Sequence, residues 1–324
     1  MNENLKIEEC KNDKEWNDFI IKTENKNIYS TSEFINYSSG NKKKFYIKKN
    51  EEILGSFHVN YSKKKILKGE TIYSPINFKK FEKKNKSSDI YKKFNVIKTF
   101  VDFITKNFIN GNFILDSHVQ DLRPFYWYNF DNNKTIFKVE DTRYTSILEI
   151  KENFKNPNIN ELLKSDLFKN FSRSIKQQLK SPLNKDFIFQ ENFNLESAFE
   201  ILNKTFKRQK KKIDYNLKKL KKIYLDLYSR KQLKIFYTIE NNENIAFSIF
   251  SKINDKAIYL NGGRLKNLNT DYSLTFNLAH SFMRLRIEGV NIIDLEGVNS
   301  PNRGFWKLGF GGNLLPYYHI SMNK

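Results

Sequence analysis

Apolar and polar positions along the chain follow a pattern that occurs once in each half. Short apolar and aromatic runs are separated by a polar turn, which is typical of a β-hairpin. Phe45–Val59 (FYIKKNEEILGSFHV) aligns without gaps on Phe236–Phe250 (FYTIENNENIAFSIF), with Asn50 on Asn241 in the turn. We therefore predict an internal repeat that contains the same hairpin in both halves.

A second correspondence follows downstream in each half. Phe100–Asp116 (FVDFITKNFINGNFILD) aligns on Leu278–Asp294 (LAHSFMRLRIEGVNIID). Apolar residues recur at helical spacing in the first part of each segment and form a short continuous run in the last part, which predicts a helix followed by a buried strand. Gly111 and Gly289 are aligned, and we expect each to end its helix in a left-handed conformation. Each half is then hairpin, strand, helix and strand.

The stretch between the repeats, Leu162–Lys234, is rich in Lys and Leu. Its periodic apolar positions predict helices that open the second half, around Ser165–Leu179, Leu195–Phe206 and Leu217–Tyr228. The predicted fold class is α/β in α+β layers, with two similar lobes that are each a mixed sheet flanked by helices. We place the first lobe and the crossover at residues 1–150 and the second lobe at residues 151–324.

Composition and charge narrow the class of protein. The 29 Phe and 17 Tyr exclude a disordered chain, and only 12 Gly and 6 Pro in 324 residues exclude a collagen-like one. Lys and Arg number 57 against 36 Asp and Glu, for a net charge of +21, and all but nine of the basic residues are Lys. A basic field attracts polyanions such as RNA, nucleotide-sugars or acidic lipid surfaces. Because Lys, Asn, Ile, Phe and Tyr all have A/T-rich codons, genome composition explains much of the excess, and the charge alone identifies no partner.

The compartment is inferred from cysteine usage and from apolar runs. Cys10 is the one cysteine, which excludes an internal disulfide and a cysteine-built zinc site. The first residues lack an apolar stretch of the signal-peptide type, and no segment approaches the roughly 20 apolar residues of a membrane span. We expect a cytoplasmic protein, and leave open its peripheral association with the inner membrane.

The arrangement of hairpin, strand, helix and strand, with a small residue in the second hairpin strand, resembles the half-fold of GNAT acyltransferases. Tandem halves of this kind are characteristic of the Fem aminoacyltransferases, which build peptidoglycan bridges, and of bacterial FemAB-like or BioF2-like N-acyltransferases. The likeness spans most of the chain and rests on three stretches: Asp116–Asn129 (DSHVQDLRPFYWYN) with Tyr144-Thr145; Thr205–Gln209 (TFKRQ); and Ala257–Arg264 (AIYLNGGR) with Asp294–Val298 (DLEGV) and Phe305–Gly312 (FWKLGFGG).

The resemblance implies transfer of an acyl or aminoacyl group to an amine, on an amino-sugar or nucleotide-sugar used for cell-surface glycans. GNAT enzymes that bind acetyl-CoA usually carry a glycine-rich loop before the central helix, whose N–H groups hold the pyrophosphate. Arg264–Tyr272 (RLKNLNTDY) holds that place here and has no glycine. The donor therefore stays open among acyl-CoA, an acyl-carrier protein and aminoacyl-tRNA. No permanently bound cofactor and no DNA partner are expected.

Two further functions remain as alternatives. The first is a Fem-type transferase that uses aminoacyl-tRNA in peptidoglycan bridge synthesis. The second is a non-catalytic RNA-binding or scaffold protein on a degenerate GNAT fold. For the enzymatic functions we expect direct transfer with a carboxylate base, because the sequence contains no Gly-x-Ser-x-Gly elbow. No metal site is expected, since the four His are far apart and no HExxH pattern occurs.

Four residues are candidates for the catalytic base. Asp116 and Asp294 occupy equivalent places at the end of the last strand of each half, where carboxylates often face the ligand crevice of an open sheet. The Fem resemblance also places an implicated aspartate at Asp116. The competing interpretation is a turn cap. Glu296 would share the face of Asp294 if the strand continued, and His118 is either a base or a structural histidine.

Lys307, within FWKLGFGG, is the first candidate for substrate binding. The resemblance implies a lysine near the nucleotide-sugar, where it would neutralise a phosphate or the developing oxyanion. The alternative is an ordinary surface lysine. Gly309, Gly311 and Gly312 indicate that the backbone around it is tightly constrained.

The other binding candidates lie in the remaining resembling stretches. Arg123 and Trp127 would bind an anionic, ring-bearing substrate by a bidentate fork and by stacking, or Arg123 would anchor the crossover to the second lobe. Arg208 would contact the acceptor or a phosphate, or make a surface pair. Three substrate-binding candidates complete the set: Tyr259, Gly263 and Asn299. Tyr259 lies in the third predicted strand of the second lobe, and at Asn261-Gly262-Gly263, after that strand, the backbone would approach the donor or simply turn.

Overall fold

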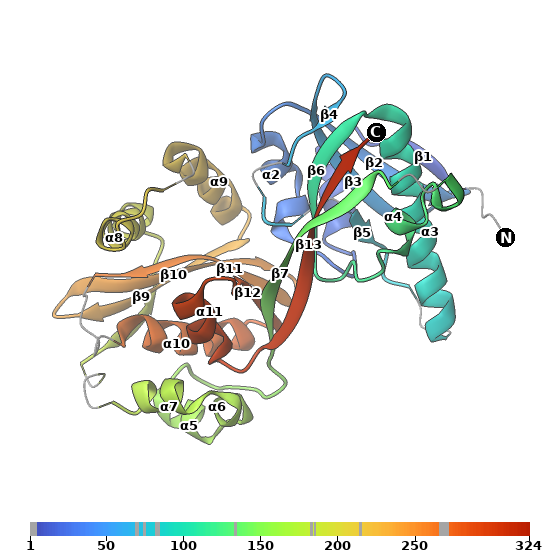
Figure 1. Cartoon of the computed structure of the whole chain (residues 1–324). Helices are drawn as coiled ribbons and strands as arrows, with labels where there is room; N and C mark the ends of the chain where they lie inside the picture. Colours follow the sequence, from blue (N-terminus) through green and yellow to red (C-terminus); the bar gives the residue numbers. More distant parts are fainter. Residues whose placement is uncertain are drawn as a thin grey trace. The chain divides into compact units, whose positions relative to one another are not determined.

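The computed structural model describes residues 5–68, 71–73, 76–81, 85–132, 135–181, 184, 186–213, 216–265 and 272–324. The chain forms two compact units (Figure 1): unit 1 is Met1–Arg143 with Pro316–Lys324, and unit 2 is Tyr144–Leu315. The sequence led us to expect the division at residue 150. It falls at Arg143 in the structure, and the end of the chain returns to unit 1, because the last strand pairs antiparallel with a strand there, with Tyr318 opposite Leu115.

Unit 1 is a mixed sheet with helices packed against it. Its strands are β1 (Lys6–Glu9), β2 (Asn41–Lys49), β3 (Glu52–Ser62), β4 (Lys65–Ile66), β5 (Ile76–Phe78), β6 (Asn110–Leu115) and parts of β7 (Phe137–Glu149) and β13 (Asn313–Asn323). They lie in the order β1-β2-β3-β4-β6-β13-β7, with β5 beside β3, and β4 pairs in parallel with β6. Its α-helices are α1 (Asp13–Ile20), α2 (Ser32–Tyr37), α3 (Lys86–Asn107) and α4 (Arg123–Tyr126).

The core of unit 1 forms around the apolar face of α3. Phe100 is fully buried, and its ring contacts those of Phe57 on β3 and Phe113 on β6, with centroid distances of 5.2 and 5.6 Å. Burial of apolar surface of this kind is the main driving force for packing a helix on a sheet. The helical periodicity predicted around Phe100 is therefore confirmed.

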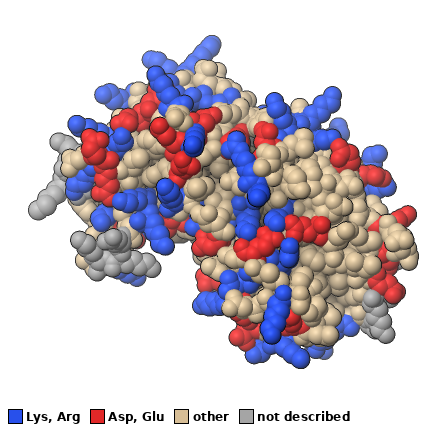
Figure 2. All heavy atoms as spheres, turned by 180° about the vertical axis from the view of Figure 1, so that it is seen from behind, with Lys and Arg blue, Asp and Glu red and all other residues tan. Residues whose placement is uncertain are grey.

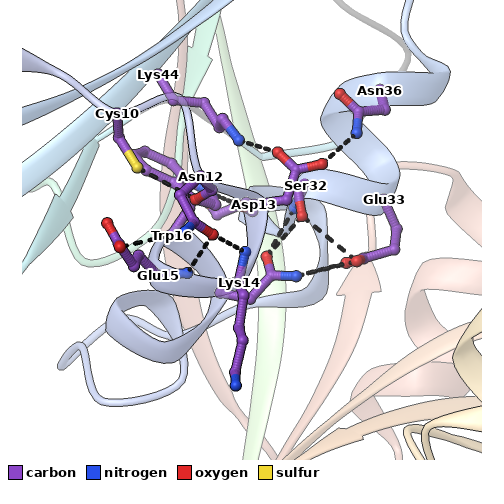
Figure 3. A network of polar contacts seen from close by, with 12 residues as sticks. Cys10, Asn12, Asp13, Lys14, Glu15, Trp16, Ser32, Glu33, Asn36 and Lys44 are labelled. Carbon is purple, nitrogen blue, oxygen red and sulfur yellow. Dashed lines mark hydrogen bonds and ion pairs between the residues drawn. The ribbon is translucent and has the colours of Figure 1, made fainter.

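A polar network attaches α1 and α2 to the sheet of unit 1 (Figure 3). Lys44 of β2 is only 7% exposed, and its ammonium pairs with the carboxylate of Asp13, which also accepts a hydrogen bond from Asn36 at 3.0 Å. Glu33 accepts a hydrogen bond from Asn17 at 2.9 Å. The charged groups of Lys44, Asp13 and Glu33 thus each have a partner, as buried charges require.

The strands of unit 2 continue the same mixed sheet from β7, in the order β7-β12-β11-β10-β9-β8. Its strands after β7 are β8 (Ile188–Glu191), β9 (Leu233–Glu240), β10 (Glu243–Ile253), β11 (Lys256–Arg264) and β12 (Ile292–Gly297). Its helices are α5 (Ile159–Lys164), α6 (Asp166–Asn170), α7 (Arg173–Leu179), α8 (Leu195–Arg208), α9 (Leu217–Ser229), α10 (Ser273–Ile287) and α11 (Pro301–Leu308). Figure 1 shows α8 and α9 on one face of β9–β11 and α10 on the other. The predicted layered α/β lobes are therefore observed.

The internal repeat is confirmed in detail at the two hairpins. Asn50 and Asn241 both adopt a left-handed conformation in the turn, with φ of 53° and 51°. Leu54 and Ile245 are the unmatched residues of a bulge at the same place in each hairpin. Asn tolerates positive φ better than most residues, which explains why both turns carry it.

Two expectations about helix ends need correction. Gly289 does follow α10 in a left-handed conformation, with φ of 88°. Gly111 instead lies inside β6, where a Cβ atom would come within 2.6 Å of the Cβ of Ile66, so it provides room for the neighbouring strand. The single helix predicted at Ser165–Leu179 is two helices, because Phe171 is extended and the Ser172 side chain caps α7.

Basic and acidic side chains are mixed on the surface of the molecule. On the face shown in Figure 2, Lys and Arg side chains are interspersed with Asp and Glu side chains. Surface pairs such as Lys48 with Glu8, at 2.7 Å, contribute little to the free energy of unfolding. Such mixing agrees with a largely compositional origin of the net charge.

Candidate active site

The parallel strands β11 and β12 stop pairing part of the way along unit 2. Their register runs from Lys256 opposite Ile292 to Ile258 opposite Asp294 and ends there. Both strands continue beyond this point, β11 to Arg264 and β12 to Gly297. Several of the polar candidates follow the point where this pairing ends, so the candidate site of unit 2 lies there.

Asp294 is held by two hydrogen bonds at this point. Its Oδ1 accepts from the hydroxyl of Thr145 on β7 at 2.6 Å and from the backbone N–H of Glu296 at 2.8 Å. The side chain is 1% exposed. These contacts match the turn-cap interpretation of Asp294. A carboxylate that accepts the backbone N–H of the residue two positions further along the chain fixes the local backbone conformation.

Glu296 adopts a left-handed conformation, with φ of 56°. The pairing of β12 with β7 shifts register between Asp294 and Gly297, so the strand bulges here and the alternation of faces is lost. Positive φ in a residue other than Gly costs about 1–3 kcal/mol and is concentrated at functional sites. The carboxylate of Glu296 is buried. Glu296 is thus placed by the bulge, not by the regular strand that the sequence suggested.

Lys307 of α11 is buried beside this bulge. Its Nζ donates to the carbonyl oxygens of Leu295 at 2.5 Å and Gly297 at 3.3 Å, which flank Glu296. The side chain is 6% exposed, and its Nζ lies 5.1 Å from the centroid of the Tyr259 ring, within cation–π range. The interpretation of Lys307 as an ordinary surface lysine is wrong.

The pKa of Lys307 is lowered to about 8. Burial is the largest cause, because it penalises the charged ammonium, and Arg303 acts in the same direction. Glu296, and to a smaller extent Asp294, oppose this effect by attraction and raise the pKa. At neutral pH Lys307 is therefore mainly protonated, yet close enough to its pKa to lose the proton in mildly alkaline solution.

The glycines around Lys307 allow α11 and the turn after it to pack closely on α6 and α7. Gly311 has φ of 78°, and a Cβ atom there would lie 2.5 Å from the carbonyl oxygen of Asn170. A Cβ atom on Gly309 would lie 2.8 Å from Ile175, and the Gly309 carbonyl accepts the N–H of Ser172 at 2.7 Å. The expected tight backbone geometry is observed, and it fixes the helix that carries Lys307.

Thr205 and Arg208, from TFKRQ, contact the end of β11. The Arg208 guanidinium donates from Nη1 to the carbonyl oxygens of Arg264 at 2.7 Å and Leu265 at 3.0 Å. The Thr205 hydroxyl bonds the Arg264 carbonyl at 3.1 Å, and a Cβ atom on Gly263 would lie 2.7 Å from that hydroxyl. Gly263 thus gives α8 room to approach β11, and these contacts of Arg208 are with backbone.

Tyr259 and Asn299 complete the candidates in unit 2. Tyr259 is 7% exposed, and its burial raises the pKa of the phenol, so it stays neutral. Asn299 accepts the backbone N–H of Tyr144 at 2.7 Å and donates to the Tyr144 carbonyl at 3.1 Å. Asn299 therefore extends the pairing of this region with β7.

Asp116 and His118 form the corresponding arrangement in unit 1. Asp116 is 5% exposed; its Oδ1 accepts the backbone N–H of His118 at 2.8 Å, and its Oδ2 accepts from Asn25 at 3.0 Å. The His118 ring nitrogen Nδ1 lies 3.5 Å from the same Oδ1. An aspartate and a histidine side chain thus lie close together, and each belongs to a residue type that acts in general acid–base catalysis.

Arg123 is engaged by a neighbour in unit 1. Its Nε and Nη2 donate to the two carboxylate oxygens of Asp121 at 2.8 and 2.6 Å, and this contact lowers the pKa of Asp121. The guanidinium also lies 5.4 Å from the ring centroids of Phe94 and Trp127. Trp127 is 53% exposed, so an aromatic face is accessible there.

The sequence did not reveal the role of two supporting residues. Thr145 and Asn25 each bond one of the candidate aspartates, but a hydroxyl and an amide far away in sequence carry no signal that identifies their partner. Most of the segment 264–272, whose missing glycines left the donor open, lies outside the described residues. Within the described ranges, no three His, Cys, Asp or Glu side chains gather closely enough to hold a metal ion, and no helix is long and apolar enough to cross a membrane.

Solved structures define the class of fold. FemX superposes with a TM-score of 0.64 over 97% of this chain and 96% of its own, at 12% identity. A tandem GNAT protein from the clavulanic acid biosynthesis pathway gives 0.50 over 98% of both chains, at 6% identity. The C-terminal domain of a putative lysylphosphatidylglycerol synthetase from Agrobacterium fabrum gives 0.51 over 84% of this chain and 81% of its own, at 8% identity.

The chain therefore has a tandem GNAT-like fold, of the kind found in FemX. This confirms the predicted fold and, at the level of fold, the resemblance to FemAB-like proteins. No protein-family model and no curated protein matches the sequence itself.

Proposed function

We propose that this protein is an acyltransferase that moves an acyl or aminoacyl group from an activated donor directly to an amine. The observation that carries the proposal is the buried Lys307 beside Glu296, at the point where β11 and β12 of a GNAT-like lobe stop pairing. At one bulge the chain holds a carboxylate that can take the proton of the attacking amine and a buried ammonium that can stabilise the oxyanion.

Each group has a defined role. The amine nitrogen of the acceptor attacks the donor carbonyl, a C–N bond forms, and Glu296 takes the proton that the nitrogen loses. The C–S bond of a thioester donor, or the C–O bond of an ester donor, breaks, and the leaving group takes that proton from Glu296, which restores the carboxylate. The Lys307 ammonium stabilises the negative charge that develops on the carbonyl oxygen, or holds a substrate phosphate. Asp294 positions Glu296 through the N–H that it accepts.

Asp116 with His118 is the second candidate for the base. Asp116 accepts the backbone N–H of His118, and Nδ1 of the His118 ring lies 3.5 Å from the same oxygen, which supports this assignment. The proposed remaining contacts are Arg123 and Trp127 for an anionic ring-bearing substrate. If Asp116→Asn abolishes transfer while Glu296→Gln does not, the base belongs to unit 1.

The finer assignment concerns the two substrates and the compartment. We propose an amino-sugar or nucleotide-sugar acceptor for cell-surface glycans, in the cytoplasm or at the inner face of the membrane. The donor is an acyl-CoA, an acyl-carrier protein or, in the Fem-type alternative, an aminoacyl-tRNA; the likeness to FemX supports this alternative equally. Lys307 suits all three donors, because each passes through the same tetrahedral oxyanion.

The test compares donors directly. Purified protein is incubated with glucosamine and with a uridine-diphosphate amino-sugar, using either ¹⁴C-acetyl-CoA or bulk tRNA charged with ¹⁴C-amino acids. Label in an acceptor supports the proposal and names the donor class. Absence of label from both acceptors with both donors, for protein that is folded by circular dichroism, would favour the non-catalytic scaffold.

A further inference from the structure

A groove of about 580 Å³ lies between the end of α8 and the beginning of α9 in unit 2. Four lysines line it: Lys207 from α8, Lys211 and Lys212 after it, and Lys218 from the first turn of α9. All four side chains are exposed. The groove shares no lining residue with the proposed site of acyl transfer.

The charge of this groove differs from that of the rest of the surface. No described residue that lines it is acidic, and none of its four ammonium groups pairs with a carboxylate of the described part of the chain. The segment from residue 207 to residue 222 contains nine Lys and Arg and a single acidic residue, Asp214. Genome composition raises the number of lysines everywhere, but it does not explain why this segment has nine basic residues and one acidic residue.

The positive charge of the groove lies partly at the beginning of α9, where a helix disfavours positive charge. This 13-residue helix has no acidic residue in its first turn, where the helix dipole favours negative charge, and it carries Lys218 and Lys219 there instead. Asn216 caps the helix by accepting the N–H of Lys219 at 3.1 Å. A bound anion would relieve both the mutual repulsion of the lysines and their unfavourable position at the helix end.

The groove also has an apolar side. Phe206 lines it and is half-buried, together with Ile213 and Leu217. A positively charged groove with an aromatic side chain is the arrangement that proteins use for single-stranded nucleic acid, because lysines neutralise successive phosphates and the ring stacks on a base. Lys offers point charges without the planar fork of Arg, which suits contacts to a backbone irrespective of sequence.

We propose that this groove binds the phosphodiester backbone of a single-stranded nucleic-acid segment. Lys207, Lys211, Lys212 and Lys218 contact phosphates, and Phe206 contacts a base. Four separate cations along an open groove match a run of phosphates better than the two or three phosphates of a small nucleotide. The proposal does not depend on acyl transfer, so either can fail alone.

The experiment measures binding of fluorescein-labelled oligouridine of about 12 nucleotides by anisotropy, from low to moderate salt. A variant with all four groove lysines changed to Gln is expected to bind about 100-fold more weakly at low salt and to lower the slope of log K against log salt by about 3. The matched control changes Lys63, Lys64, Lys65 and Lys106 to Gln, which are exposed lysines of unit 1. It loses the same charge and is expected to bind within about twofold of wild type.

A second variant tests stacking. Phe206→Leu keeps an apolar side chain and is expected to bind at least about fivefold more weakly with little change in the salt slope. Oligodeoxythymidine of equal length distinguishes DNA from RNA as the source of the backbone. The proposal is overturned if the control variant weakens binding as much as the groove variant, if ATP competes as well as the oligonucleotide does, or if wild type shows no saturable binding.

Discussion

The carboxylate of Asp294 accepts a hydrogen bond from the backbone N–H of Glu296, two residues further along the chain, at 2.8 Å. Asp116 makes the same contact with the N–H of His118, also at 2.8 Å. Asp116 directly follows β6, whereas Asp294 lies within β12, at the point where its pairing with β11 ends, and not at the end of the strand as the sequence suggested. In each unit a buried aspartate therefore positions the titratable side chain that follows it.

This relationship predicts that Glu296 and Asp294 respond differently to substitution. Glu296→Gln removes the proposed base and is expected to lower kcat about 100-fold or more. Asp294→Asn keeps an oxygen that can accept the N–H of Glu296 and is expected to retain most of the activity. Asp294→Ala leaves the buried Thr145 hydroxyl and the N–H without an acceptor and is expected to cost about 2–3 kcal/mol of unfolding free energy. Transfer rates and urea denaturation measure these effects; loss of activity in Asp294→Asn alone would make Asp294 the base.

The protonation of Lys307 predicts an alkaline limit to the reaction. Its pKa is lowered to about 8, so the ammonium is lost as the pH rises through that value. The rate is expected to fall correspondingly above pH 8. Glu296→Gln removes the charge that raises the pKa of Lys307. The alkaline fall in the remaining activity of this variant is therefore expected at lower pH than in wild type. The profile of rate against pH tests this, and a limb that persists in Lys307→Met would assign it to another group.

The buried histidines predict how stability depends on pH. Burial is the main cause that lowers the pKa of His58 and His280 to about 4. Their folded pKa lies below the unfolded value of about 6.5, so the folded state is favoured above pH 6.5 and loses that advantage as the pH falls toward 4. When the pH is lowered from 7 to 5, each histidine is expected to decrease the free energy of unfolding by about 2 kcal/mol. Urea denaturation at both pH values measures the loss, which should shrink in His58→Met.

Substitution of two glycines with similar φ distinguishes the cost of backbone strain from the cost of steric overlap. Gly311 and Gly289 have φ of 78° and 88°, but a Cβ atom would lie 2.5 Å from the Asn170 carbonyl at Gly311 and would meet nothing within 4 Å at Gly289. Gly289→Ala is expected to lose about 1 kcal/mol by strain alone. Gly311→Ala adds overlap with backbone and is expected to lose about 3 kcal/mol. Equal losses in thermal denaturation would show that packing at Gly311 adjusts freely.

Periodic features of the fold could be predicted from the sequence because they depend on local pattern. The hairpins follow from alternating runs around Asn50 and Asn241, and α3 follows from the spacing of apolar residues such as Phe100. Gly111 shows the limit of this reasoning. A glycine after an apolar periodic stretch resembles a helix end, yet here it makes room for Ile66 on a strand that is distant in sequence.

The candidate site depends on contacts between distant segments, which pattern does not show. The burial of Lys307 results from the packing of α11 beside β12, and its sequence signal was limited to the surrounding glycines. The left-handed conformation of Glu296 arises from a bulge against β7, where an acidic residue has no propensity that reveals it. Arg208 and Asn299 likewise bond backbone groups whose position only the fold determines.

The most direct test of the account is the transfer of ¹⁴C-acyl or ¹⁴C-aminoacyl label to an amine by wild type, Glu296→Gln and Glu243→Gln, at matched concentration and with the melting temperature of each recorded. Glu243 lies at the exposed start of β10 and serves as the control. The account predicts transfer by wild type and Glu243→Gln and a loss of about 100-fold or more in folded Glu296→Gln. Undiminished transfer by Glu296→Gln would contradict it.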